Sequence, residues 1–429
     1  MSHYTIKILK AKGHYFDFFG KYIQFEEVTR MDLFEKCYNY GPESPLYDAK
    51  IATEKGLYPY FIPFEETEGT EVTYNGRKLI MLGSNNYLGL THHPKVREAA
   101  KKAIDEYGTS ATGSRFMNGT LKIHRELEDA LAEFLHKESV IVFSTGYQTN
   151  LGTISALLEP NDYAIMDTED HASIVDGWKM SHSRFMRFNH NDMDGLERAL
   201  KKTDEKAGKL IVVDGIYSMA GDIAPLGKII ELKKKYNARL MVDDAHAIGV
   251  IGEKGRGTAN YFNLEDETDL IMGTFSKSFA SLGGFIAGDK EVIEYVKHFA
   301  RPFIFSASMT PASAAAAFAS LKIMQEEPGR IEHLWTISDR MRTGLKELGF
   351  DIGSSNTPII PVYIRDRWKT VMVWKELFDM GVYVNPVLPP AVKPKDCLLR
   401  TSYIATHTEE QIDRALSIFE TVGKKTGII

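Results

Sequence analysis

Cysteine is scarce in this chain of 429 residues, which contains two, Cys37 and Cys397. They lie far apart and form no Cys-x-x-Cys pair, so the sequence excludes a disulfide framework and a cysteine-based zinc site and favours a reducing compartment. No apolar run reaches the ~18 residues of a membrane-spanning helix, and the N-terminal end lacks a secretory signal. We therefore expect a cytoplasmic protein, and any membrane role would be peripheral, on the inner face of the membrane.

An excess of positive charge is also missing. The net charge of -6 gives no electrostatic reason to expect nucleic acid as a partner. No Gly-x-Gly-x-x-Gly follows an early strand, which argues against a nicotinamide dehydrogenase. His92 and His93 precede Pro94 without an acidic partner at ligand spacing, so we predict no metal site there.

Strands and helices are expected to alternate through the middle of the chain. Leu226–Tyr236 places Ile229, Ile230 and Leu232 toward a core and several lysines toward water. Short apolar runs with strand character recur at Ser139–Phe143, Tyr163–Met166, Leu210–Val213, Leu240–Val242 and Leu270–Met272. This alternation predicts an α/β fold with a mainly parallel sheet covered by helices, in which ligands bind at the carboxyl ends of the strands.

Three parts are expected along the chain. Residues 1–75 would form an N-terminal arm, aromatic-rich between residues 14 and 25, whose contact with a membrane or a second subunit is left open. The Asn75-Gly76 turn predicts a hairpin over Val72–Ile80. Residues 76–328 would form the large domain. Residues 329–429 would form a smaller α+β domain containing a strand at Ile359–Ile364 and helices at Lys369–Met380 and Glu409–Thr421.

The stretch Asp269–Ser278 carries the strongest chemical signal. A Lys at position 277 follows a short apolar run through Gly, Thr and Ser, as in a buried strand that opens into a loop. The preceding run ends in Asp243, Asp244 and His246, about one strand–helix–strand length upstream. Pyridoxal phosphate (PLP) chemistry requires such an amine, a carboxylate for the pyridine nitrogen and donors for the remaining polar groups.

Polar residues follow the other runs as well. Ser144–Asn150 opens either an anion-binding helix or an ordinary capped one. His171 could stack on a flat ring or cap the next helix, and Ser218 could donate to a ring hydroxyl or stabilise a turn. All these groups are expected at one edge of the parallel sheet, where together they would surround a planar phosphorylated ring.

Seven motifs occur in a specific order between about Tyr58 and the C-terminus: Asn85–Gly89, Gly113–Phe116, Gly119–Thr120, His124–Glu128, Asp170–Ser173, Asp243–His246 and Gly273–Ser278. They resemble those of the α-oxoamine synthases. The resemblance implies a PLP-dependent transferase of fold type I, a homodimer with shared active sites, that joins an amino acid to an acyl-CoA with loss of carbon dioxide.

The resemblance also implies roles for individual residues. Lys277 would attach the cofactor as an imine and carry protons, Asp243 would pair with the pyridinium nitrogen, and His171 would stack on the ring. His246 and Ser218 would bind the ring hydroxyl. The phosphate would be held by Gly146, Tyr147, Thr274, Ser276 and, from the second subunit, Ser306.

The substrates are expected to be L-serine and a long-chain acyl-CoA, with Arg400 and Asn85 binding the amino acid. Family members that use alanine with a pimeloyl thioester, or glycine with acetyl-CoA, remain alternatives. Another fold type I enzyme, such as an aminotransferase, is a further alternative, which would release neither CoA nor carbon dioxide. A non-catalytic subunit is a weaker alternative, because Lys277 is present with its partners Asp243 and His246. One departure is Leu388, which stands before Pro389-Pro390 where related enzymes have an Arg.

Overall fold

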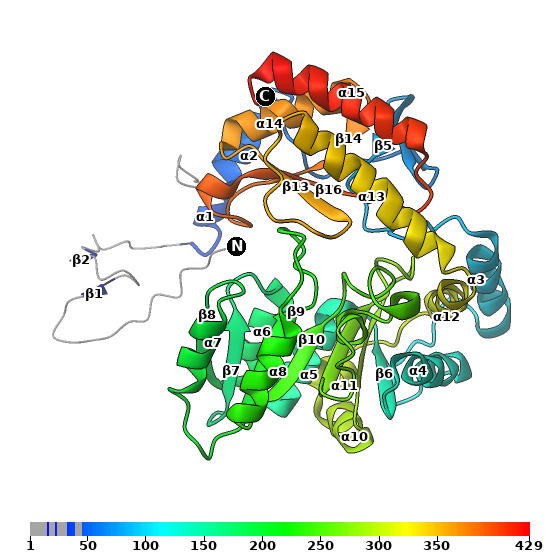
Figure 1. Ribbon diagram of the computed structural model, residues 1–429. Coiled ribbons are helices and arrows are strands. Elements are labelled where there is room, and N and C mark those ends of the chain that lie inside the picture. The colour runs from blue at the N-terminus through cyan, green and yellow to red at the C-terminus, as the bar shows by residue number, and fades with distance from the viewer. Residues whose placement is uncertain (1–14, 17–21, 24–31, 39–44) are drawn as a thin grey trace.

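The computed structural model describes residues 15–16, 22–23, 32–38 and 45–429, which form a large α/β part and a smaller part beside it (Figure 1). Most of the aromatic stretch at residues 14–25 lies outside the described residues. The described elements before residue 60 are β1 (Tyr15–Phe16), β2 (Tyr22–Ile23), α1 (Glu35–Tyr38) and α2 (Pro45–Glu54). Among the residues that the structure describes, no helix has both the length and the apolar character needed to cross a bilayer.

A seven-stranded sheet forms the centre of the large part, in the order β6-β12-β11-β10-β9-β7-β8. Six strands run parallel, and β12 runs antiparallel to both of its neighbours. The strands are β6 (Ser139–Phe143), β7 (Tyr163–Asp167), β8 (Arg184–Phe188), β9 (Lys209–Asp214), β10 (Arg239–Asp243), β11 (Leu270–Thr274) and β12 (Gly284–Gly288). The five predicted runs are all strands of this sheet, so the prediction of a mainly parallel sheet is confirmed.

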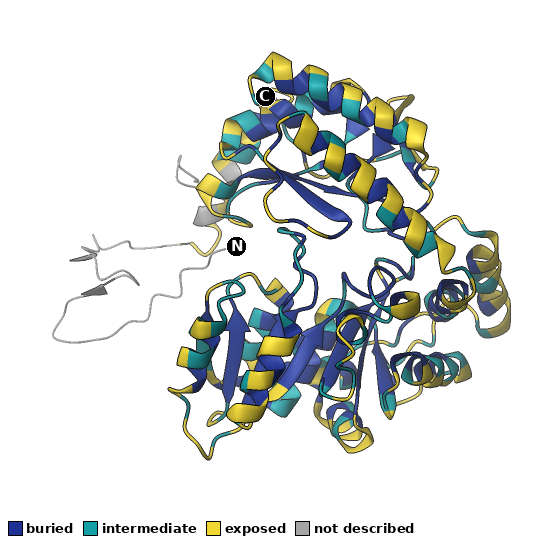
Figure 2. Ribbon diagram, in the orientation of Figure 1, coloured by how far each residue is buried: buried dark blue, intermediate teal, exposed yellow. Residues whose placement is uncertain are grey.

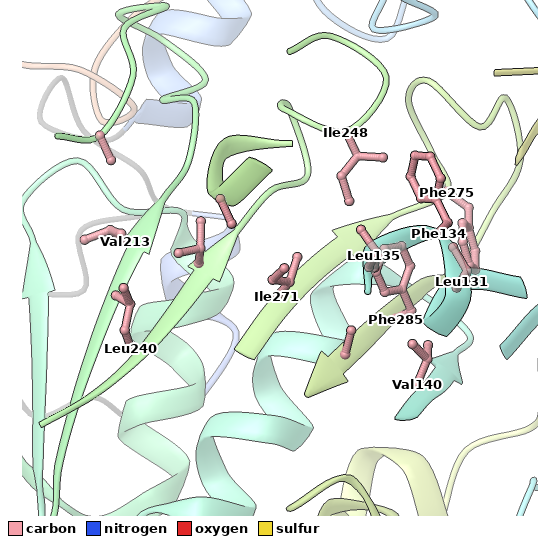
Figure 3. Packing of buried hydrophobic residues seen from close by; sticks show 14 of the residues in the cluster. Leu131, Phe134, Leu135, Val140, Val213, Leu240, Ile248, Ile271, Phe275 and Phe285 are labelled. Carbon is pink, nitrogen blue, oxygen red and sulfur yellow. The ribbon is translucent and has the colours of Figure 1, made fainter. Parts of the chain in front are cut away.

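Helices cover both faces of the sheet, because successive strand side chains point to opposite sides. On β10, Leu240 and Val242 pack into one cluster and Met241 into the other. Figure 3 shows Leu240 beside Val213 and Ile271, which come from neighbouring strands. The first face packs against α3 (Pro94–Tyr107), α4 (Lys122–Leu135), α7 (Met193–Leu200), α8 (Leu226–Lys235) and α12 (Pro311–Glu326), and the second against α5 (Gly146–Leu157), α6 (Ala172–Ser181), α10 (Lys290–Phe299) and α11 (Arg301–Ile304).

The layered arrangement is visible in the burial pattern: the central strands of the large sheet are almost entirely buried, and most of the covering helices expose one side (Figure 2). Two short elements, η1 (Glu253–Gly255) and α9 (Thr258–Tyr261), follow β10. The six parallel strands bring their carboxyl ends to one edge of the sheet, where the loops that follow them are close together.

The smaller part has its own core and combines distant stretches of the chain. Its elements are β3 (Glu66–Thr67), β4 (Glu71–Tyr74), β5 (Arg77–Met81), α13 (Gly329–Glu347), β13 (Ile359–Tyr363), α14 (Arg367–Asp379), β14 (Val382–Tyr383), β15 (Asn385–Val387), η2 (Pro394–Asp396), β16 (Leu398–Ser402) and α15 (Glu409–Thr426). They form two small sheets, of order β13-β16-β15 and β14-β5-β4-β3. The strand and both helices predicted beyond residue 329 are present.

The hairpin predicted around Asn75 and Gly76 is also present, as β4 and β5. The other edge of β5 pairs in parallel with β14, and Leu79 and Ile80 pack in the core of the smaller part. The predicted boundary at residue 76 falls between β4 and β5, the two strands of this hairpin. Both strands lie in the smaller part, because β5 also pairs with β14. The division of the chain into three parts stays a prediction. In the structure, β3, β4 and β5 share a sheet with β14 of the C-terminal part.

Candidate active site

The loops at the carboxyl edge of the large sheet enclose a cavity of about 260 Å³. The parallel register aligns Asp214 and Asp243, the last residues of β9 and β10, with Met272 of β11. The cavity is lined by Thr145, Gly146, Tyr147, Asn150, His171, Ser173, Asp214, Ile216, Asp243, Ala245, His246, Met272, Thr274, Ser276, Lys277, Leu282 and Gly283. Residues from five strand ends thus meet at the predicted edge.

Lys277 lies in the loop after β11, three residues beyond the end of the strand. Burial lowers the pKa of its ammonium to about 8, although the carboxylates of Asp243 and Asp214 act in the opposite direction. Near neutral pH the uncharged amine, which can attack a carbonyl carbon, is therefore far more abundant than in an ordinary lysine.

Asp243, at the end of β10, is 5% exposed and is fixed from two sides. Its Oδ2 accepts a hydrogen bond from Asn150 Nδ2 at 2.7 Å, and its Oδ1 accepts one from the backbone N–H of Ala245 at 3.0 Å. Among the described residues, no Lys, Arg or His nitrogen lies within ion-pair distance of this carboxylate. A buried carboxylate in this state suits a ligand that brings its own positive charge.

Of the two roles considered for His171, the helix cap is observed. It caps α6, because its Nδ1 accepts from the backbone N–H of Ser173 at 3.3 Å and lies 2.7 Å from the Ser173 hydroxyl. The ring also lines the cavity. Burial lowers the pKa of His171, which leaves a neutral imidazole able to lie against a flat ligand.

His246 is buried and lines the same cavity. Burial, and then the nearby charges of Lys277 and Arg400, lower the pKa of His246 well below its usual value. Its Nδ1 lies 2.7 Å from the hydroxyl of the buried Tyr87. Tyr87 is contacted in turn by Arg400, so a continuous polar path joins the cavity to the smaller part.

Arg400 is 4% exposed and lies on β16. Its Nε donates to the backbone carbonyl of Ser218 at 2.6 Å, whereas its terminal nitrogens make only long contacts, 3.4 Å to Ser402 and 3.5 Å to Tyr87. Donors held at the limit of hydrogen-bond distance are suited to exchange these partners for a substrate carboxylate.

The N-terminus of α5 forms an anion-binding corner. Thr145 caps the helix, and Gly146 begins it. A side chain at Gly146 would bring its Cβ within 2.7 Å of the Thr274 hydroxyl, so only glycine allows this approach. The Thr274 and Ser276 hydroxyls lie 2.9 Å apart and face the same cavity. Free backbone N–H groups and hydroxyls in this arrangement are typical of a phosphate site.

Most of the predicted site residues lie together. Those that line the cavity are Gly146, Tyr147, His171, Asp243, His246, Thr274, Ser276 and Lys277. Four others lie outside the lining: Asn85, Ser218, Ser306 and Arg400. Asn85 and Arg400 both contact Tyr87, and Ser306 accepts from the side chain of Gln148 on α5 at 3.0 Å. The backbone carbonyl of Ser218, rather than its hydroxyl, accepts a hydrogen bond, which comes from Arg400 Nε.

Several polar residues around the cavity were not singled out from the sequence. Asn150 and Asp214 line it, and Asp214 accepts from the backbone N–H of His171 at 3.3 Å. Burial raises the pKa of Asp214 well above its usual value. Asn150 follows Gly146 by one helical turn, so the 3.6-residue period could have placed it on the same face. Nothing in the local pattern marks Asp214, which ends an otherwise apolar strand.

A further carboxylate pair lies beside this edge and holds His190. Its Nδ1 is 3.1 Å from Asp167 and its Nε2 is 2.9 Å from Asp222. Burial opposes the charged imidazolium, but the two carboxylates prevail and raise the pKa of His190 to about 10. This bridge fastens the ends of β7 and the loop after β9 to each other.

The residues of the cavity fit PLP. The corner at α5 suits its phosphate, and the buried carboxylate of Asp243 suits a protonated pyridine nitrogen. Lys277 provides an amine whose uncharged form is readily reached, because its pKa is about 8, and the neutral His171 provides a flat partner for the ring.

The sequence matches the model of the aminotransferase class I and II family over residues 77–419. The chain belongs to this family. Within it, the chain is similar to a serine palmitoyltransferase of Sphingobacterium spiritivorum, with 52% identity over 374 residues that cover 87% of this chain and 94% of the relative.

The chain is also similar to a solved structure and to a relative with a different activity. A serine palmitoyltransferase variant from S. paucimobilis, solved with a bound PLP–myriocin aldimine, superimposes with a TM-score of 0.90 and 37% identity, covering 93% of this chain and 100% of that chain. An 8-amino-7-oxononanoate synthase of Treponema denticola is 43% identical over 377 residues, covering 88% of this chain and 95% of the relative. The resemblance inferred from the motifs is confirmed, and the serine enzymes are the more similar relatives of those compared.

Proposed function

We propose that this chain is a PLP-dependent acyltransferase that condenses L-serine with a long-chain acyl-CoA near palmitoyl, with release of carbon dioxide and CoA. The product would be 3-oxosphinganine, so the reaction would be the first step of sphingolipid biosynthesis. The observation that carries the proposal is one cavity holding Lys277, Asp243, His171 and His246 in a chain that is 52% identical to a serine palmitoyltransferase.

Bound PLP takes up the electrons that are released when bonds at the amino-acid Cα break. The phosphate would be held by the N-terminus of α5 together with Thr274 and Ser276, as the geometry of that corner suggests. Asp243 keeps the pyridine nitrogen protonated, because a buried carboxylate favours a nearby positive charge. Asn150 orients that carboxylate through its 2.7 Å hydrogen bond.

Lys277 is the group proposed to move protons at the substrate Cα. Its lowered pKa of about 8 places it close to the working range of a general base. His171 is neutral and caps α6, so its ring position is fixed. We propose that it lies on the cofactor face and that its Nε2, the nitrogen not engaged by Ser173, holds the substrate carboxylate.

Arg400 is proposed to bind the serine carboxylate together with Asn85, through the terminal nitrogens whose present contacts are long. His246, with Nδ1 already facing Tyr87, would bind the ring hydroxyl through Nε2. We retain Ser218 as a second donor to that hydroxyl, although its carbonyl is the group that contacts Arg400.

A homodimer with shared active sites is part of the proposal. Several large apolar side chains are exposed in the single chain: Phe116 (53%), Met117 (76%), Leu282 (56%), Phe299 (57%) and Phe305 (73%). Leu282 also lines the cavity, so a second subunit that covered this surface would also border the site. Ser306 lies beside Phe305 and would contribute its hydroxyl to the partner's phosphate site.

We further propose a cytoplasmic location with peripheral contact at the inner face of the membrane. The proposed acyl-CoA carries a long apolar chain and the proposed product is a lipid precursor, so both favour contact with a membrane surface. The scarcity of cysteine agrees with a reducing compartment.

The test is release of CoA from a series of acyl-CoA thioesters, each offered with serine, glycine and alanine. Serine with palmitoyl-CoA should be the best pair. If alanine with a pimeloyl thioester or glycine with acetyl-CoA were preferred, the proposed substrates would be wrong. The variant Lys277→Ala should lose turnover and the borohydride-sensitive absorbance of the bound cofactor, and retained covalent cofactor would contradict the role of this lysine.

A further inference from the structure

A second cavity, larger than the first, lies between α2 and the C-terminal part. It encloses about 480 Å³. Its walls are mainly apolar and include Ala52, Met219, Val371, Val387 and Leu388, with the indole of Trp368 at one side. The catalytic roles described above leave this cavity unused.

The polar groups in its wall are already paired. Arg367 lies 2.5 Å from Asp48, and the hydroxyl of Tyr60 donates to the carbonyl of Pro386 at 3.2 Å. Burial raises the pKa of Tyr60 to about 12, so the phenol remains neutral. An apolar guest would therefore displace few polar contacts from this wall.

The second cavity is connected to the proposed serine site through adjacent residues. Met219 in its wall directly follows Ser218, whose carbonyl accepts the hydrogen bond of Arg400 Nε at 2.6 Å. Val387 belongs to β15, which pairs with β16, the strand that carries Arg400. The residue proposed to bind the amino-acid carboxylate is thus connected by contacts to the walls of both cavities.

We propose that the second cavity binds the acyl chain of the thioester substrate. This inference rests on the proposed function and names the part of the molecule that recognises chain length. A cavity of ~150 Å³ accommodates one benzene, so 480 Å³ corresponds to roughly three such volumes, or about eighteen carbon atoms. A sixteen-carbon chain matches this volume, and it would pass Met219 with its carbonyl carbon at the serine site.

The variant Ala52→Leu tests the assignment. Ala52 is 7% exposed on α2 and lines the cavity, and leucine adds three carbons while remaining a good helix former. Each methylene excluded from burial should lower kcat/KM roughly fourfold, the ratio that corresponds to ~0.8 kcal/mol. We expect palmitoyl-CoA to lose roughly 60-fold and octanoyl-CoA less than twofold, with the serine-induced absorbance change of the bound cofactor preserved.

The matched control is Ala99→Leu on α3, which lines a separate cavity of about 330 Å³. It should leave the chain-length profile unchanged. If the profile of Ala52→Leu equals that of the parent, or if both variants change it alike, the assignment is overturned.

A binding measurement tests the location of the acyl chain independently of catalytic activity. A non-reactive thioether analogue of palmitoyl-CoA, brominated along its acyl chain, should quench tryptophan fluorescence in the parent, because Trp368 lines the cavity. The quenching should be lost in Trp368→Phe. No quenching, or quenching that persists in Trp368→Phe, overturns the inference, even if Ala52→Leu misfolds.

The outcomes separate this inference from the proposed function. A parent enzyme that releases no CoA from serine with any thioester refutes the function, and the bromine measurement still tests the cavity. A parent that prefers long chains while both cavity tests fail keeps the function and places the acyl chain elsewhere.

Discussion

Removal of the cofactor should reveal the unusual acidity of Lys277 directly. Burial lowers its pKa to about 8, against an ordinary value of 10.5. Only the uncharged amine can attack the PLP aldehyde. The rate of cofactor capture by the apoenzyme should therefore rise with pH up to about 8 and then level off.

The size of the effect follows from the two pKa values. At pH 7 roughly one Lys277 side chain in ten would be uncharged, compared with roughly one in three thousand for an ordinary lysine. This amounts to a difference of roughly 300-fold in the reactive fraction. Asp243 acts in the opposite direction to burial and stabilises the ammonium, so Asp243→Asn should move the midpoint of the profile to lower pH.

The assay is stopped-flow absorbance as PLP attaches to the apoenzyme, between pH 6.5 and 10.5. Free lysine measured at each pH corrects for the ionisation of PLP itself. A capture rate that keeps rising tenfold per pH unit beyond pH 9 would refute the argument, because the amine would then have an ordinary pKa. A midpoint that moves upward in Asp243→Asn would refute the assigned electrostatics.

Three other changes test separate parts of the structure. Asn150→Leu removes a hydrogen bond to the charged carboxylate of Asp243, worth ~1.5–3 kcal/mol, so kcat should fall roughly 10- to 100-fold in steady-state assays while the KM for serine stays close to that of the parent. Arg400→Ala should raise the KM for serine roughly 100-fold and leave the cofactor absorbance intact; an unchanged KM would assign carboxylate binding to another group. His190→Gln should lower the Tm most below pH 6.5 and least near pH 10, because a pKa raised from 6.5 to about 10 gives stabilisation that is complete below the unfolded value and lost as pH rises through the folded one; a Tm difference that grows with pH would contradict this.

The parallel strands could be predicted because they are apolar on both faces and are followed by polar residues. Two strands of the large sheet, β8 and β12, were not predicted from the sequence. β8 lies at the sheet edge and reads Arg-Phe-Met-Arg-Phe, with the exposed or partly exposed pattern of a half-covered strand. β12 begins and ends with Gly and is the one antiparallel strand of this sheet. Its position between β6 and β11 depends on contacts that local periodicity does not contain.

The cavity residues could be predicted where strand order dictates their position, as for Asp243, His246 and Lys277. Tyr87 belongs to a motif that was recognised, yet its contact with His246 joins residues 159 positions apart. Its role could not be inferred from neighbouring residues. The second cavity was beyond prediction for the same reason, since its wall is assembled from α2, the loop after β9 and the C-terminal part.

The pairing of β5 with β14 has a consequence for synthesis on the ribosome. Arg77 at the start of β5 contacts the carbonyl of Asp379, which lies 302 residues later in the chain. At ~5–20 residues per second, the outer edge of β5 has to wait roughly 15–60 s for its partner to emerge. The large sheet, by contrast, can close as soon as β12 is made. We therefore expect the large sheet of the nascent chain to assemble while the β4–β5 hairpin still has an unpaired edge. During this interval the chain should be most prone to aggregation and most dependent on chaperones.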